Sequence, residues 1–109
     1  MNGWPIFDTT IQTSSDERLQ KDIQDSKIDA LSIIKALACR EFKWKQDDRF
    51  EELGFIAQQV KEVNPKFVGK RIIDDETYYT LDLIAIIPYL VKAIQELAVT
   101  VTNFAKVGT

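Results

Sequence analysis

Ser15 and Lys21 are the residues of this sequence whose side chains could together carry out covalent chemistry. A serine hydroxyl can act as a nucleophile without histidine when a neutral lysine amine accepts its proton. The lysine must then lose its charge near neutral pH, which requires burial or a nearby cation such as Arg18. Capping is the more common role of a serine beside a helix start, and Ser14 and Glu17 have the spacing of a capping box. Both roles remain open from these residues alone.

The composition leaves few other chemistries. The chain of 109 residues has no histidine and one cysteine, which excludes His-based triads, histidine metal ligands, an intrachain disulfide and a multi-cysteine zinc site. The acid pairs Asp47-Asp48 and Asp74-Asp75 lack the spacing of a calcium loop, so we expect no metal, and we expect no cofactor. The net charge of −3 argues against a nucleic-acid partner. The lack of an unbroken apolar run of roughly 18 residues argues against a membrane partner.

The elements that must position these residues indicate one domain of the α+β class, mostly helical with short strands. The apolar spacing predicts a short turn of helix over residues 18–23, an amphipathic helix over 27–39, strands over 41–45 and 50–56, a short helix over 56–63, and a protruding β-hairpin arm over 67–82. Ser26 is expected to begin the amphipathic helix, and Cys39, on its apolar stripe, to be buried. No glycine stands between the hairpin strands, which predicts a turn longer than two residues.

The last third of the chain carries an apolar seam on a long predicted helix. Its members repeat in alternating steps of four and three residues, the a/d pattern of a coiled coil: Leu83, Ile87, Leu90, Ile94, Leu97, Val101 and Phe104. The β-branched residues at a favour a parallel dimer, but the uncharged residues at e and g widen the stripe beyond what one partner helix covers. Several partner helices, or the rest of the domain, must cover it, so a core helix of a monomer stays open. Pro88 is expected to kink or delay this helix.

Four blocks stand in order along the chain: Ser15 to Ile23 (SDERLQKDI), Leu53 to Val60 (LGFIAQQV), Pro65, and Pro88 to Leu97 (PYLVKAIQEL). Together they resemble the C-terminal intramolecular chaperone domain of phage tailspikes, tail fibres and neck appendages, which endosialidase tailspikes also carry. The resemblance implies that residues 15–109 are this domain and that residues 1–14 are a lead-in or the end of an upstream fibre. It also implies a homotrimer, in which the long C-terminal helix forms a trimeric bundle and the hairpin arm embraces the upstream β-fibre.

The resemblance further implies self-cleavage, because members of the family cut themselves next to the serine of an S-D-x-R-x-K motif. Ser15, Asp16 and Arg18 match this motif, but Gln20 stands at the lysine position and Lys21 follows it. Ser15 would then be the nucleophile of a single-turnover serine peptidase. Either Lys21 serves as its base or Gln20 impairs the cut, since one step along an α-helix turns the side chain by about 100°.

The function implied is therefore that of an assembly chaperone, released by a cut between Ser14 and Ser15 or between Ser15 and Asp16. Its partners would be two further copies of itself and the upstream β-fibre of the same polypeptide. It would act in the cytoplasm of the host bacterium during assembly, with the parent protein in the tail or neck fibre of the virion. The alternative is a plain coiled-coil oligomerisation module without chaperone or protease activity.

Overall fold

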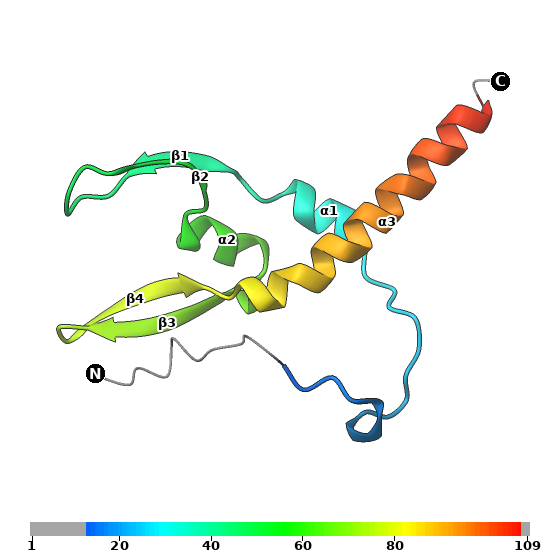
Figure 1. The fold of residues 1–109 in the computed structure, drawn as a ribbon, viewed down its shortest axis with the longest axis horizontal. Helices are drawn as coiled ribbons and strands as arrows, with labels where there is room; N and C mark the ends of the chain where they lie inside the picture. Colours follow the sequence, from blue (N-terminus) through cyan, green and yellow to red (C-terminus); the bar gives the residue numbers. More distant parts are fainter. Residues whose placement is uncertain (1–12, 108–109) are drawn as a thin grey trace.

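A computed structural model describes residues 13–107 and shows two β-hairpins, short helices and one long C-terminal helix (Figure 1). In chain order the elements are the 3-10 turn η2 (Glu17–Leu19), α1 (Ala30–Lys35), β1 (Arg40–Lys43), β2 (Phe50–Gly54), α2 (Ala57–Val63), the 3-10 turn η3 (Pro65–Phe67), β3 (Val68–Ile73), β4 (Glu76–Leu81) and α3 (Leu83–Val107). This order confirms the predicted α+β class with short strands, a hairpin arm and a long C-terminal helix. The lead-in expected over residues 1–14 lies almost wholly outside the described residues.

Helix α1 is shorter than the helix predicted over residues 27–39, and it starts at a different cap. Asp29, not Ser26, is the N-cap: its carboxylate accepts hydrogen bonds from the backbone N–H of Ser32 (3.2 Å) and from the Ser32 hydroxyl (2.8 Å). These bonds to the charged form lower the pKa of the Asp29 carboxyl. Cys39 is exposed rather than buried, because the helix has ended before it and the chain runs on towards β1.

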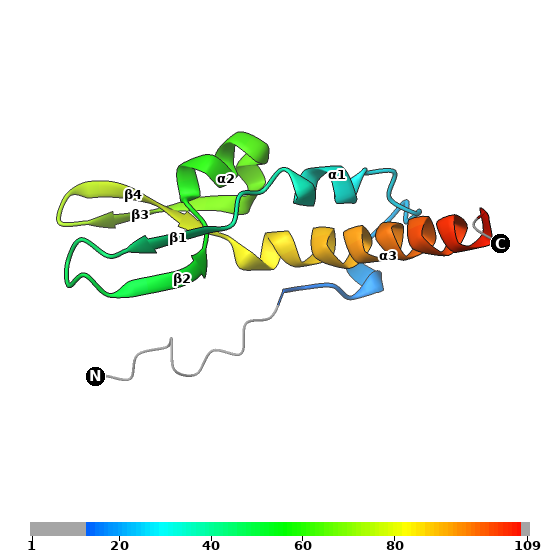
Figure 2. The same cartoon turned by 90° about the horizontal axis from the view of Figure 1, so that it is seen from above.

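The two hairpins form separate two-stranded antiparallel sheets and point away from the C-terminal end of α3 (Figures 1 and 2). In the first hairpin, a bulge separates the pair Arg40–Gly54 from the pair Phe42–Glu51. A Cβ atom at Gly54 would lie 3.0 Å from the Phe42 ring, so any larger residue there would push the ring aside. Trp44 meets the Phe42 ring edge-on at 5.2 Å, and its indole N–H donates to Glu51 at 3.1 Å. These contacts hold the hairpin together from within.

The second hairpin confirms the predicted arm but corrects its turn. Its register runs without a break from the pair Val68–Leu81 to the pair Ile73–Glu76, which leaves a turn of two residues. Both turn residues, Asp74 and Asp75, have positive φ angles, 50° and 66°. A two-residue turn of this twist needs such angles at both positions. The prediction of a longer turn is wrong because aspartate, like glycine, tolerates the left-handed region.

The core of the single chain is small and joins the short elements to the start of α3. Val60 from α2, Phe67 from η3 and Ile86 from α3 are buried together. Phe67 also packs edge-to-face against Tyr89 of α3, with 4.8 Å between ring centres. Few other described side chains are buried, so one chain on its own leaves much of its apolar surface in water. Such a chain gains much from association with a partner.

Helix α3 begins at Leu83 and continues through Pro88 to Val107. The carboxylate of Asp82 accepts a hydrogen bond from the backbone N–H of Ala85 at 3.1 Å and starts the helix. The predicted delay at Pro88 is therefore wrong, because this cap fixes the first turn upstream of the proline. By length and composition alone, α3 could cross a membrane, and little of its apolar stretch is buried within the chain.

Candidate functional site

The segment that carries Ser15 is held by a pair of opposite charges in the 3-10 turn η2. The Asp16 carboxylate accepts hydrogen bonds from the backbone N–H of Arg18 (2.9 Å) and from two nitrogens of its guanidinium, Nε (3.0 Å) and Nη2 (2.7 Å). This fork lowers the pKa of Asp16 and raises that of Arg18. Asp16 is thus the N-cap, and the capping box expected from Ser14 and Glu17 is wrong. The Asp and Arg of the motif have a shared structural role: they fix the backbone just after the serine.

The predicted nucleophile and base are both exposed in the single chain. Within residues 13–107, no hydrogen bond joins the Ser15 side chain to Gln20 or Lys21. The backbone is extended at Gln20 (φ −113°, ψ 154°), and Asp22 has a positive φ of 55°. The angle of about 100° between consecutive α-helical side chains therefore does not apply at residues 20 and 21. The roles of Ser15 and Lys21, and the bond that is cut, stay predictions.

The same segment stands apart from the body of the chain, as the blue end of the ribbon shows (Figure 1). Its apolar residues Leu19 and Ile23 are 76% and 68% exposed. Ser15 is likewise exposed, and among residues 13–107 no side chain shields it from water. Within the described part of the chain, Lys21 is exposed and lacks the enclosed surroundings that a neutral lysine would require.

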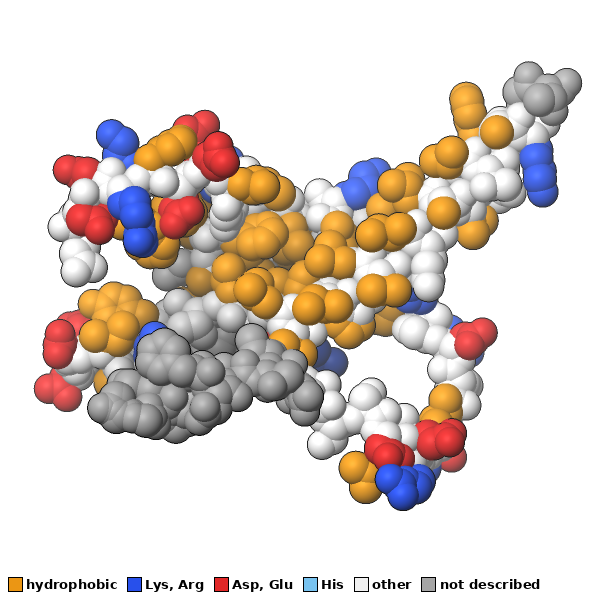
Figure 3. Space-filling model, viewed as in Figure 1, with side chains coloured by type: hydrophobic (Ala, Val, Ile, Leu, Met, Phe, Trp, Pro, Cys, Tyr) orange, Lys and Arg blue, Asp and Glu red, His pale blue; other side chains and the backbone are white. Residues whose placement is uncertain are grey.

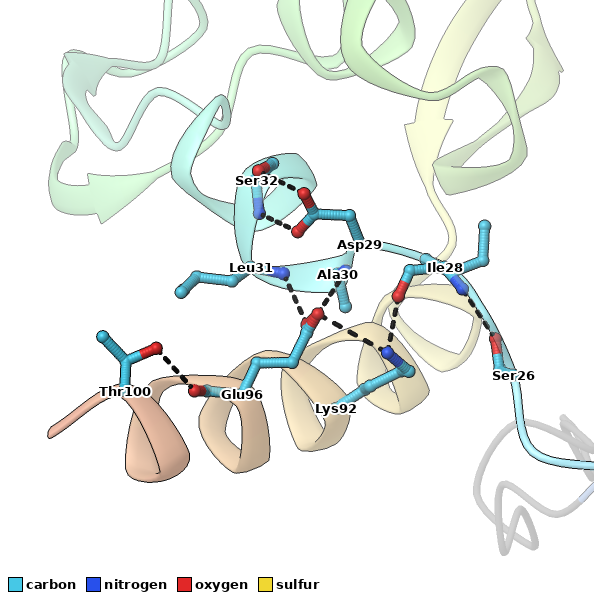
Figure 4. A network of polar contacts seen from close by, with 9 residues as sticks. All are labelled: Ser26, Ile28, Asp29, Ala30, Leu31, Ser32, Lys92, Glu96 and Thr100. Atoms are coloured by element: carbon cyan, nitrogen blue, oxygen red, sulfur yellow. Dashed lines mark hydrogen bonds and ion pairs between the residues drawn. The ribbon is translucent and has the colours of Figure 1, made fainter. Parts of the chain in front are cut away.

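A second polar cluster joins the start of α1 to α3 (Figure 4). The Glu96 carboxylate of α3 accepts hydrogen bonds from the backbone N–H groups of Ala30 (3.2 Å) and Leu31 (3.0 Å), at the start of α1. Lys92 donates to the carbonyl oxygen of Ile28 and lies 3.5 Å from the Glu96 carboxylate. A side chain of α3 therefore caps the N-terminus of α1, although Glu96 and Ala30 are 66 positions apart in the sequence. The negative charge of Glu96 also stabilises α1, because it lies at the positive, N-terminal end of the helix dipole.

Sequence reasoning missed this junction, although a signal for it exists. Lys92 and Glu96 are charged residues four apart within an otherwise apolar stretch of α3. Their charges must be satisfied if the surrounding helix surface is covered. That condition predicts a polar partner, but nothing in the residues says that the partner is the start of α1.

The seven seam residues of α3 lie on a face that this chain does not cover. Their exposed fractions run from 40% at Leu90 to 79% at Phe104. Apolar side chains gather along α3 in the space-filling view (Figure 3). The face that packs within the chain carries Ile86 and Ala93, at the g positions of the heptads. The alternative of a core helix of a monomer is therefore wrong for this seam.

Comparison with known proteins finds a match for the part of the chain that carries Ser15 and α1. A sequence model of the protein family described as “Chaperone of endosialidase” matches residues 15–69, half of the chain. The match begins at Ser15 and extends over η2, α1, the first hairpin, α2 and η3. No curated protein matches the chain.

Proposed function

Because this chain belongs to the family of the chaperone of endosialidase, we propose that it trimerises and holds the upstream strands of a phage tail fibre or tailspike in register while they fold. Family membership establishes a chaperone role. The further steps proposed are association of three copies, alignment of the upstream strands, and release by a cut beside Ser15. They would take place in the cytoplasm of the host bacterium, before the parent protein enters the tail or neck fibre of the virion.

The physical need for such a chaperone lies in the fibre. Strands that come from three chains must close long loops before their contacts form, and a slip of one residue turns every side chain to the wrong face. A trimer formed beforehand raises the local concentration of the three strands and fixes their alignment. Removal of the chaperone afterwards leaves a fibre that cannot refold once it is opened, so it is held kinetically.

The exposed seam of α3 is the observation that supports trimerisation most strongly. Seven apolar side chains at a and d positions face away from the chain. Ile86 and Ala93 at g are buried within the chain, but Val91 at e is 51% exposed and uncharged. It makes the exposed stripe wider than a strict a/d seam, which favours three helices over two. A membrane could cover the same helix. However, Lys92 and Glu96 bind the start of α1, and these bonds would have to break for α3 to enter lipid.

Native mass spectrometry of the purified chain at micromolar concentration tests this proposal. We expect a trimer. A monomer or a dimer would contradict it, and sedimentation with phospholipid vesicles would then decide whether α3 inserts into lipid. A plain oligomerisation module would also form a trimer. Fusion of the chain behind an aggregation-prone β-fibre separates the two, because only a chaperone raises the yield of folded fibre.

Release is tested at Gln20. We expect Gln20→Lys to raise the fraction of chains cut beside Ser15 at least tenfold over the unchanged chain, because it restores the lysine of the motif. The measurement is the mass of the two fragments after incubation of the folded trimer, and the fragment masses also identify the bond. The double variant Ser15→Ala with Gln20→Lys should stay whole. A Gln20→Lys trimer that stays whole would show that Ser15 is not an activated nucleophile here.

A further inference from the structure

Two lysines, one on α2 and one on the second hairpin, share Tyr79 and have no acidic partner among the described residues. Lys61 of α2 donates a hydrogen bond to the Tyr79 hydroxyl oxygen at 3.0 Å, and its Nζ lies 4.8 Å from the centre of the ring. Lys70 of β3, which pairs with Tyr79 across the ladder, lies 5.8 Å from the same centre. Neither lysine makes an ion pair with any described carboxylate. The chain has a net charge of −3, yet no described carboxylate neutralises the two ammonium groups at this site.

The hydrogen-bond donors of this site are not all used within the described chain. Lys61 uses the tyrosine oxygen as an acceptor, so the Tyr79 O–H remains a donor. Both ammonium groups keep further N–H donors of their own. The two positive charges also lower the pKa of the Tyr79 hydroxyl, Lys61 by its hydrogen bond and then by its charge, and Lys70 by its charge. Two positive charges and the donors of three side chains therefore lie around one ring, where a carboxylate would find both charge and hydrogen bonds.

The same hairpin ends in three consecutive carboxylates, Asp74, Asp75 and Glu76, which are exposed and make no ion pair with a described residue. The pair Lys70–Tyr79 lies three ladder steps from the pair Ile73–Glu76, which is about 10 Å along the strands. The hairpin is therefore basic partway along its length and acidic at its tip. Its own tip cannot fold back onto the lysines, because the ladder is continuous between them.

We propose that the acidic tip of one copy docks on the Lys61–Tyr79–Lys70 site of the next copy in the trimer. This inference rests on the proposed function, which supplies three copies. A contact between two different patches of the same surface closes into a ring when three copies are related by a threefold axis. The hairpins point away from the C-terminal end of α3, so in a parallel bundle all three lie at one end (Figure 2). A ring of crossed hairpins there would enclose the strands that the chaperone aligns.

An exchange of charges in the full-length chain tests this contact. Lys70→Glu and Glu76→Lys are each expected to raise the dissociation constant of the trimer about tenfold, measured by analytical ultracentrifugation in 50 mM NaCl. The double variant is expected to return to within threefold of the unchanged chain, because the two charges attract again with their signs reversed. These differences should shrink in 500 mM NaCl, where charges are screened over about 4 Å. Circular dichroism checks that each variant is folded.

Arg71 provides the matched control, since it is the next residue of β3 and faces the opposite side of the hairpin. Arg71→Glu combined with Glu76→Lys should show no rescue. A trimer that responds to Lys70→Glu but not to Glu76→Lys would overturn the proposal, because another acid would then fill the site. Equal dissociation constants for all variants would also overturn it. In both cases the trimer itself stands, whereas an unchanged chain that is not a trimer overturns the proposed function and this contact together.

Discussion

Val101→Asp is expected to dissociate the trimer, whereas Val99→Asp is expected to leave it intact. The two valines are ideal partners for comparison, because they lie on one helix and are both 59% exposed in the single chain. Val101 occupies an a position of the seam and Val99 an f position, on the outside of a bundle. In a trimer the seam variant loses three buried valines, each worth about 1.5 kcal/mol or more, and brings three carboxylates together. We therefore expect association to weaken by at least about 100-fold.

Sedimentation velocity over a range of chain concentrations measures this difference. The helix content of both variants, followed by circular dichroism, should match that of the unchanged chain, since each places the same side chain on the same helix. If both variants dissociate equally, the seam is not the contact surface. If neither does, α3 is covered by something other than copies of itself.

Glu96→Ala is expected to have the largest effect on the stability of the fold. Its carboxylate accepts the backbone N–H groups of Ala30 and Leu31, and its side chain is 28% exposed. Its removal leaves two N–H groups at the start of α1 without an acceptor and leaves the ammonium of Lys92 without its ion pair. Breaking a partly buried network of this kind costs about 1–3 kcal/mol. Urea unfolding, followed by circular dichroism, measures the loss in the free energy of unfolding.

Two further variants separate the cap from a general effect of substitution in α3. Gln95→Ala changes the neighbouring residue, which makes no side-chain hydrogen bond within residues 13–107, and should lower stability by less than about 0.5 kcal/mol. Glu96→Gln keeps one acceptor oxygen and should fall between the two. If Glu96→Ala costs no more than Gln95→Ala, then α1 is not held to α3 through this carboxylate.

The sequence predicts those helices and strands whose limits are set by neighbouring residues. Alternation around Phe42 predicts the first strand, Asn64-Pro65 ends α2, and the spacing of four and three predicts α3. One error falls where two residues compete for the same cap position. Asp29 and Ser26 are both good caps, and only the contact of α1 with α3 selects the aspartate.

The candidate sites could be predicted only as far as their chemistry is local. The motif around Ser15 is contiguous in the sequence, so its residues can be recognised. The helix cap there is Asp16, whereas the spacing of Ser14 and Glu17 indicates Ser14. The junction of Glu96 with Ala30 joins residues 66 positions apart, and no spacing rule reaches that far. The site at Tyr79 needs Lys61 from another element, 18 positions away, and appears only once α2 packs on the hairpin.

The junction in Figure 4 also restricts how α3 can vary between related chains. In an ordinary coiled coil the outward positions b, c and f drift freely, and only the a and d residues are constrained. Here Lys92 stands at f and Glu96 at c, and both are engaged with the start of α1. The helix is therefore constrained along two faces at once over its first half, and along one face beyond Thr100. We therefore expect few positions of α3 to tolerate substitution near Pro88, and more positions to tolerate it towards Val107.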